Sequence, residues 1–162
     1  MPKPGKPIPE GSHSLTPYLV VRDAPKAIEF YKKAFGATEK FRAAGPDGKI
    51  MHAELRIGDS QFFLTDENLE WGSKSPLSVG GTGLSTWIFT EDADKMYNAA
   101  VGAGAKPGMP LADMFWGDRW GTLTDPFGHA WQIATHKLDL TPEEMKAAQD
   151  KAMAEMMAKK PS

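Results

Sequence analysis

Apolar and polar residues follow two different periods along residues 14–66. The run from Ser14 to Arg22 is rich in apolar and β-branched residues and predicts a strand. From Asp23 to Gly36 the apolar residues recur every three or four positions. They follow an aspartate suited to cap a helix and a proline in the first turn. This segment predicts an amphipathic helix, and three further strands are expected after it: Thr38–Ala44, Ile50–Ile57 and Gln61–Asp66.

The second half of the chain repeats this plan. Residues 85–93 align with residues 16–24 at a constant spacing, and both segments end in an Asp-Ala pair that precedes a helix. The strand, turn and strand of residues 123–134 align with residues 55–65, with a slightly longer turn. The repeat predicts an α+β fold of two tandem βαβββ modules, residues 14–71 and 83–138, whose half-sheets join into one curved mixed sheet.

Two further segments flank the modules. Residues 1–13 are rich in proline and glycine and predict a flexible or surface-draped arm. Residues 139–160 predict a C-terminal helix, which begins with a capping box at Thr141 and Glu144. Its apolar stripe either packs on the chain's own sheet or fits a groove of a partner subunit. That stripe consists of Met145, Met153, Met156 and Met157.

Composition excludes several classes of function. The net charge of −2 gives no bulk attraction to nucleic acid or to an anionic membrane, and no apolar run is long enough to span a bilayer. The absence of cysteine excludes disulfides and thiolate chemistry. The glycine-rich stretches at 80–83 and 102–104 do not match a nucleotide-binding fingerprint. We therefore expect a cytoplasmic protein without nucleic-acid or membrane partners and without a cofactor.

Several longer motifs resemble one known family. The hairpin Thr124–Trp131 (TDPFGHAW) is similar to the Asp-Pro…Gly-His hairpin of the vicinal oxygen chelate superfamily, which includes glyoxalases, bleomycin-resistance proteins and extradiol dioxygenases. Together with four more strings it resembles the PhnB-like branch of that superfamily, over nearly the whole chain. These strings are Pro17–Ala24, Phe30–Ala37, Met51–Glu54 and Met114–Arg119. The resemblance implies the two-module fold, homodimers and a small-molecule ligand or substrate.

The resemblance also implies where a divalent metal would be held, namely on the first and last strands of each module. Carried onto this chain, those positions are Thr16, Phe63, Ser85 and Gln132. Two hydroxyls, an aromatic ring and one amide are poor ligands for a first-row metal, which prefers imidazole and carboxylate. The sequence therefore predicts no metal at the family position.

A substitute site on the third predicted strand remains an alternative. Strand alternation places Ile50, His52, Glu54 and Arg56 on one face, with Met51, Ala53, Leu55 and Ile57 on the other, under the helices. His52 and Glu54 supply two metal ligands, but Arg56 beside them opposes a cation. The competing interpretation is a polar network in which Glu54 pairs with Arg56 or a cross-strand partner.

The same alternation predicts an aromatic-lined cavity on the concave face. Its expected lining is Tyr18, His52, Phe63, Trp87, Trp120 and Gln132, a common composition for a small-molecule site. The alternative is that these aromatic side chains simply fill the concave face.

Trp116 and Arg119 suit a lid or an anion clamp, or else Trp116 packs against a second subunit. Trp131 has the opposite parity from Gln132 and is assigned to the core, and His129 is expected to order its turn.

Three functions follow from these features. The leading hypothesis is a homodimeric, metal-free protein that binds a small organic molecule, which His52, Arg56 and Arg119 favour as neutral or anionic. The alternative is a glyoxalase-like isomerase or lyase, with His52 as general base and Tyr18 or Arg119 polarising a carbonyl. The third is an interaction module that uses the C-terminal helix.

Overall fold

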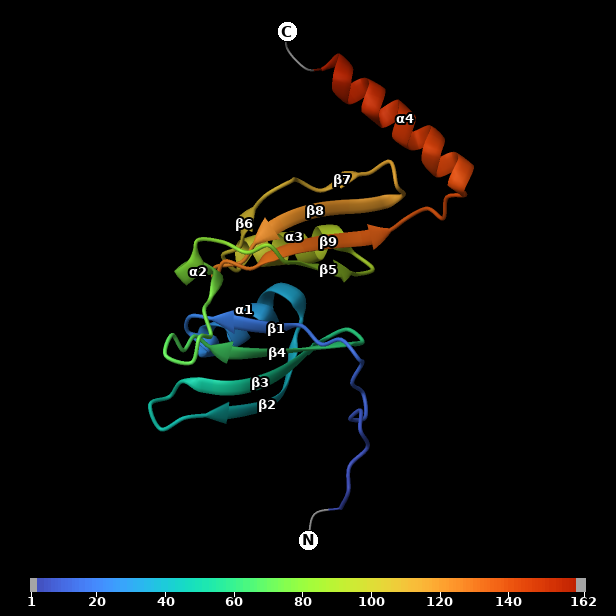
Figure 1. The fold of residues 1–162 in the computed structure, drawn as a ribbon. Coiled ribbons are helices and arrows are strands. Elements are labelled where there is room, and N and C mark those ends of the chain that lie inside the picture. Colours follow the sequence, from blue (N-terminus) through green and yellow to red (C-terminus); the bar gives the residue numbers. More distant parts are fainter. Residues whose placement is uncertain (1–2, 160–162) are drawn as a thin grey trace.

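The computed structural model describes residues 3–159, which form two βαβββ modules followed by a helix (Figure 1). Met1, Pro2 and Lys160, at the outer ends of the predicted arm and terminal helix, lie outside the described residues. The elements in chain order are β1 (Tyr18–Val21), α1 (Ala24–Phe35), β2 (Thr38–Ala44), β3 (Ile50–Ile57), β4 (Ser60–Asp66), α2 (Pro76–Val79), β5 (Ser85–Phe89), α3 (Ala93–Gly102), β6 (Lys106–Pro107), β7 (Ala112–Asp113), β8 (Asp118–Thr124), β9 (Ala130–His136) and α4 (Pro142–Ala158).

The first module forms a four-stranded sheet in the order β1-β4-β3-β2. β1 runs parallel to β4, and the other neighbours are antiparallel. α1 begins where the Asp23 side chain accepts a hydrogen bond from the Lys26 amide, and it ends at Gly36, whose φ of 65° suits a residue without a Cβ. The apolar face of α1 is buried against the sheet, as its periodicity predicts.

The second module repeats this arrangement with the order β5-β9-β8-β6, and β7 also pairs with β8. Tyr18 lies opposite Phe63 across β1 and β4, and Trp87 lies opposite Gln132 across β5 and β9. These matching registers confirm the duplication. The counterpart of β2 is reduced to the short strands β6 and β7, so this half of the repeat is less regular than the sequence pattern indicates.

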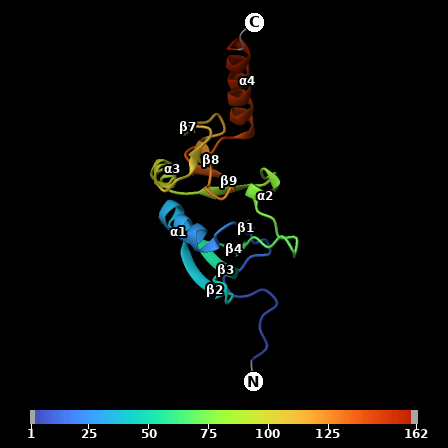
Figure 2. The same cartoon turned by 90° about the vertical axis from the view of Figure 1, so that its left-hand side faces the viewer.

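The two sheets are not hydrogen-bonded to each other within residues 3–159, in contrast to the single joined sheet that the repeat predicts. Helices α1 and α3 lie on the same side of both sheets and pack against each other (Figure 2). The Asp125 side chain, which is 4% exposed, joins the modules. It accepts hydrogen bonds from the Tyr31 hydroxyl at 2.7 Å and from the Trp131 indole at 2.8 Å. Side-chain packing behind the sheets, instead of a continuous strand ladder, holds the modules together.

Alternation along β3 holds except at its first residues. Ala53 and Leu55 are fully buried, whereas His52, Glu54 and Arg56 are half-buried on the opposite face, as predicted. Ile50, however, is buried and Met51 is 58% exposed, the reverse of the prediction. The cause is an irregularity in the pairing with β2, where the register shifts between Ala43 and Ala44. A bulge of this kind inserts one residue and reverses the parity beyond it.

The terminal helix α4 does not lie on the chain's own sheets. It extends away from the end of β9, while the N-terminal arm leaves the first module at the opposite end of the molecule (Figure 1). The predicted capping box is present, but α4 has no buried residue, and Met153, Met156 and Met157 are all more than half exposed. Of the two interpretations of its methionine stripe, packing on the chain's own sheet is therefore wrong. No helix within residues 3–159 is long and apolar enough to cross a membrane.

Candidate functional site

The predicted site residues separate into two clusters, one on each sheet. In the first module the His52 ring lies 4.9 Å from the Phe63 ring and 6.2 Å from the Tyr18 ring, measured between centroids. Phe41 lies on the other side of His52, with the ring centroids 6.4 Å apart. The cross-strand register of β1, β4 and β3 creates this cluster, since it aligns Tyr18 with Phe63 and Phe63 with Glu54.

Glu54 is held in a polar network beside this cluster. Its Oε2 accepts a hydrogen bond from the Gln61 amide at 3.0 Å, and its Oε1 lies 3.4 Å from His52 Nε2. Ser12 in the N-terminal arm donates in turn to Gln61 at 3.1 Å. Arg56 does not pair with Glu54, because its guanidinium donates to the carbonyl oxygens of Gly58 and Asp59. The cross-strand form of the predicted network is the one observed.

The second module carries a cluster of tryptophans. The Trp87 and Trp120 rings stack with centroids 6.2 Å apart and an angle of 27° between their planes. Trp116 packs edge-on against Trp120 at 5.4 Å. The Trp120 indole donates to the Gln132 side-chain oxygen at 2.9 Å, so that oxygen is already engaged. The three tryptophans therefore form an apolar surface, and the Gln132 side chain is its one polar group held in place by a hydrogen bond.

Trp116 and Arg119 do not form the expected clamp. The Trp116 indole donates to Asp118 at 3.1 Å, whereas Arg119 points to the helix side of β8. There its Nη2 donates to Asp94 of α3 at 2.7 Å and its Nη1 donates to Asp113 at 3.3 Å. These hydrogen bonds raise the pKa of Arg119 further above its ordinary value. Because strand neighbours face opposite sides of a sheet, Arg119 is turned away from the tryptophans, and the predicted anion clamp is wrong.

The positions that the family uses for a metal do not fit one in this chain. Phe63 contributes a ring that packs on His52, and the side-chain oxygen of Gln132 accepts from Trp120. Thr16 and Ser85 add only neutral hydroxyls, which are weak ligands for first-row metals. Nor does any group of three His, Cys, Asp or Glu side chains within residues 3–159 converge on a point where an ion would sit.

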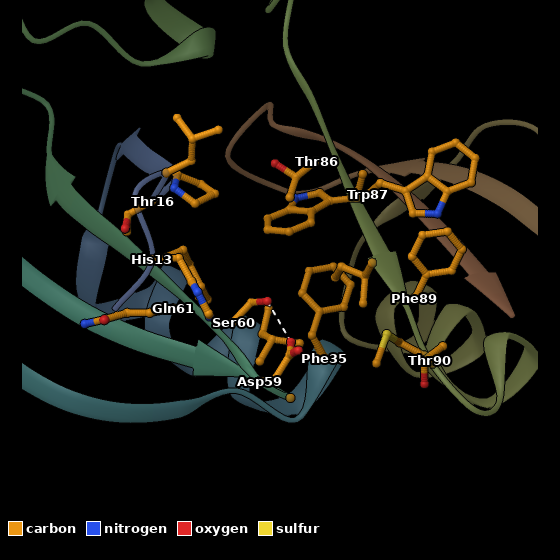
Figure 3. Close-up of a pocket in the computed structure, with 18 of the residues that line it drawn as sticks. His13, Thr16, Phe35, Asp59, Ser60, Gln61, Thr86, Trp87, Phe89 and Thr90 are labelled. Carbon is orange, nitrogen blue, oxygen red and sulfur yellow. Dashed lines mark hydrogen bonds between the residues drawn. The ribbon is translucent and has the colours of Figure 1, made fainter. Parts of the chain in front are cut away.

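A cavity of about 1020 Å³ lies between the two modules (Figure 3). One wall is the β5 strand, and the other is formed by the segment before β1 and by the turn between β3 and β4. Phe35 of α1 and Trp131 of β9 also line it, with ring centroids 4.7 Å apart. We call it the seam cavity, and its lining consists of His13, Leu15, Thr16, Pro17, Phe35, Ile57, Gly58, Asp59, Ser60, Gln61, Phe62, Thr86, Trp87, Ile88, Phe89, Thr90, Glu91, Met96, Trp131, Thr135 and His136.

Of the predicted site residues, Trp87 alone lines the seam cavity. The others lie on the two sheet faces or, in the case of Arg119, on the helix side. The cavity exists because the outer edges of β1 and β5 face each other without hydrogen-bonding. No local sequence pattern reports such a gap between segments far apart in the chain. The edge positions Thr86 and Phe89, beside Trp87, are the nearest sequence signal.

His136 lines the cavity, and no role was predicted for it from the sequence. Its Nε2 lies 2.9 Å from Asp139, in the segment leading to α4, and its Nδ1 lies 2.7 Å from Asp118. These two hydrogen bonds, the one to Asp139 first, raise the pKa of His136 above its ordinary value. When it is protonated, its imidazolium bridges the start of β8 to the segment that carries α4.

The raised pKa of His136 predicts a pH dependence of stability. Protonation is favoured in the folded protein, so the stabilisation is fully present below the unfolded pKa of about 6.5 and is lost as pH rises through the higher folded value. We expect the difference in free energy of unfolding between the wild type and His136→Gln to be largest near pH 6 and to shrink toward pH 8.5. Urea titrations across this range measure it, and a constant difference would contradict the bridge.

The fold and the cavity together define a class: a duplicated βαβββ protein with a ligand-sized space between its modules. A family model places the chain within that class, since the model of the Glyoxalase/Bleomycin resistance protein/Dioxygenase superfamily matches residues 12–133. The chain belongs to this superfamily.

Individual relatives extend this result. The uncharacterized protein Mb0911c of Mycobacterium bovis is 43% identical over 138 residues, which cover 83% of this chain and 91% of the relative. The crystal structure of the Arabidopsis thaliana At5g48480 product is similar, with a TM-score of 0.62 and 30% identity over 75% of this chain and 98% of that one. The PhnB protein of Bacillus cereus shares the fold, with a TM-score of 0.58 and 18% identity over 76% and 99% of the two chains.

Proposed function

We propose that this protein binds a small organic molecule in the seam cavity without the help of a divalent metal. The observation that carries the proposal is the cavity itself. At about 1020 Å³ it is comparable to the upper end of the usual range for ligand pockets, which is roughly 300–1,000 Å³. Aromatic side chains with a few polar groups around them are the usual composition of such pockets.

The walls of the cavity support this proposal. Trp87 is 38% exposed and Phe89 is 65% exposed, so both rings offer free apolar surface beside the opening. Phe35 and Trp131 are 3% and 2% exposed and belong to the packed core, which gives the cavity a rigid floor. A ligand that covers the exposed rings gains apolar contact without having to reorganise the floor.

Binding without a metal follows from the chemistry of the donor groups. Thr16, Phe63, Ser85 and Gln132 occupy the family's ligand positions and supply neither imidazole nor carboxylate. His52 and Glu54 lie next to each other on β3, but Glu54 is already bonded to Gln61. The ligand is therefore held by shape, apolar contact and hydrogen bonds.

An isomerase or lyase activity is the second proposal, and the contact between His52 and Glu54 favours it. A carboxylate 3.4 Å from Nε2 orients the imidazole as it would for a general base. Tyr18 is the remaining partner for polarising a carbonyl, since Arg119 is turned to the helix side. If the enzyme proposal holds, His52→Ala abolishes turnover of the substrate while leaving its binding within about twofold. Turnover that survives the substitution removes His52 from the mechanism.

Assembly as a homodimer is part of the leading proposal. The exposed methionines of α4 are a surface that the described part of the chain leaves uncovered. A second copy of the chain is the partner that the family resemblance implies. The contacts of that copy with α4 would account for a helix that buries none of its own residues.

Native mass spectrometry tests the leading proposal in one experiment. The protein is purified gently, without a tag and without a chelator, and sprayed from a volatile buffer. We expect the mass of a dimer with an added small-molecule mass and no stoichiometric divalent ion. One divalent ion per chain would overturn metal-free binding, return His52 and Glu54 as ligands and make the enzyme the leading proposal.

A further inference from the structure

The charged residues of the seam cavity carry an inference about the ligand, which rests on the proposed function. Asp59 and Glu91 are the carboxylates of the lining, which contains neither lysine nor arginine among residues 3–159. We infer that the ligand is an organic cation, with an apolar or aromatic body that carries a protonated or quaternary amine. The sequence favoured a neutral or anionic ligand because of His52, Arg56 and Arg119, but none of these three residues lines the cavity.

The two carboxylates approach the cavity from different modules. Asp59 lies in the turn between β3 and β4, and Glu91 follows β5 at the start of the turn to α3. Both residues are exposed, and neither forms an ion pair within residues 3–159. The Asp59 side chain accepts a hydrogen bond from the Ser60 hydroxyl at 2.8 Å (Figure 3). A cation at the rim therefore meets negative charge from both walls.

Two basic side chains near the cavity, Arg56 and His136, are compensated by their partners. Arg56 donates to the Asp59 carbonyl at 3.0 Å, so its guanidinium offsets part of the charge of Asp59. His136 lies between Asp118 and Asp139, and these two carboxylates more than balance its imidazolium. The rim thus keeps a net negative charge, to which we expect Glu91 to contribute more than Asp59.

The aromatic walls add a second attraction for a cation. Trp87 and Phe89 on β5 line the cavity and have exposed rings, which lie on the side of the β5 ribbon away from Asp59 in Figure 3. The faces of aromatic rings carry partial negative charge and attract ammonium groups, most strongly when the ring is that of tryptophan. Carboxylates and aromatic rings together, with no lysine or arginine among the described lining residues, make a site suited to an amine.

Three fluorescent probes with one shared body test the inference. Dansylcadaverine carries a primary ammonium, its N-acetyl derivative is neutral, and dansyl-6-aminohexanoate carries a carboxylate. The dansyl group brightens in an apolar cavity, so each probe is titrated with the full-length protein. We expect the cation to bind about tenfold more tightly than the neutral probe, which corresponds to about 1.4 kcal/mol, and the anion to bind most weakly. The preference for the cation should shrink at high salt.

Charge-neutralising variants locate the effect. Asp59→Asn combined with Glu91→Gln should bring the affinities for cation and neutral probe within about twofold, with Glu91→Gln alone giving the larger part. Glu70→Gln, which neutralises an exposed carboxylate outside the lining of the cavity, is the matched control and should change neither affinity. The salt dependence of the wild type gives the same information if the double variant does not fold.

The possible outcomes separate the two claims. Equal affinity for the cationic and neutral probes overturns the ligand class and leaves the proposed cavity in place. Tighter binding of the anion overturns the ligand class in the opposite direction. Failure of all three probes to bind overturns the cavity as a ligand site and the inference together.

Discussion

Replacing Asp125 with alanine is expected to lower the free energy of unfolding by about 4 kcal/mol. The carboxylate is buried and accepts from the Tyr31 hydroxyl, the Trp131 indole and the backbone amides of Phe127 and His129. Each buried donor left unsatisfied costs about 1–3 kcal/mol, and a water entering the vacated space recovers part of the sum. Urea denaturation followed by tryptophan fluorescence measures the change.

Two variants serve as controls for Asp125→Ala. Tyr31→Phe removes one donor together with its hydroxyl, so we expect a loss of only about 1 kcal/mol. In the wild type, burial and the charge of Asp125 raise the pKa of Tyr31 well above its ordinary value, so this hydroxyl remains a donor at neutral and mildly alkaline pH. Asp139→Ala removes an exposed carboxylate and should cost far less than Asp125→Ala. A loss below about 1 kcal/mol for Asp125→Ala would show that the modules do not depend on this residue.

Replacing Trp87 with alanine is expected to weaken binding of dansylcadaverine and of its neutral derivative by at least about tenfold. Trp87 is the one large aromatic residue that belongs both to the tryptophan cluster and to the seam cavity within residues 3–159. Covering an aromatic side chain contributes about 1.5–3 kcal/mol, and a factor of ten in affinity corresponds to about 1.4 kcal/mol. Fluorescence titration of both probes gives the two affinities.

Trp71→Ala is the matched control for Trp87→Ala. Trp71 is 76% exposed and does not line the seam cavity, so its removal should leave both affinities unchanged. An equal loss of affinity in the two variants would point to nonspecific binding at exposed tryptophans. Unchanged affinity in Trp87→Ala would move the ligand away from β5.

Local rules were sufficient to predict the main helices and strands of this fold, but not the short elements α2, β6 and β7. Asp23 and Gly36 mark the ends of α1, and Thr141 with Glu144 begins α4 as its capping box requires. The strand β3 is observed with the predicted bounds, Ile50–Ile57. These features depend on neighbours within a few residues of one another, and such interactions are visible in a single sequence.

Features that depend on distant segments were not predicted. Whether β1 hydrogen-bonds to β5 depends on how α1 and α3 pack, and the observed gap between the strands becomes the seam cavity. The register shift between Ala43 and Ala44 turns Ile50 into the core and Met51 toward solvent. Simple alternation along β3 predicts the reverse. Both outcomes arise from register and packing between segments, about which the residue pattern of one segment says little.

The candidate site shows the same division. Alternation correctly grouped Tyr18 with Phe63 and His52, and Trp87 with Trp120 and Gln132. It did not show that the two groups remain separate on two sheets. Arg119 was placed with Trp116 because they are close in sequence, but strand parity turns it toward Asp94.

Binding in the seam cavity can be seen in a crystal structure of the protein with dansylcadaverine. We expect ligand density between β5 and the β3–β4 turn, with the dansyl rings against Trp87 and the ammonium near Glu91. Density on the sheet face beside His52 and Phe63, with the seam cavity empty of ligand, would contradict it.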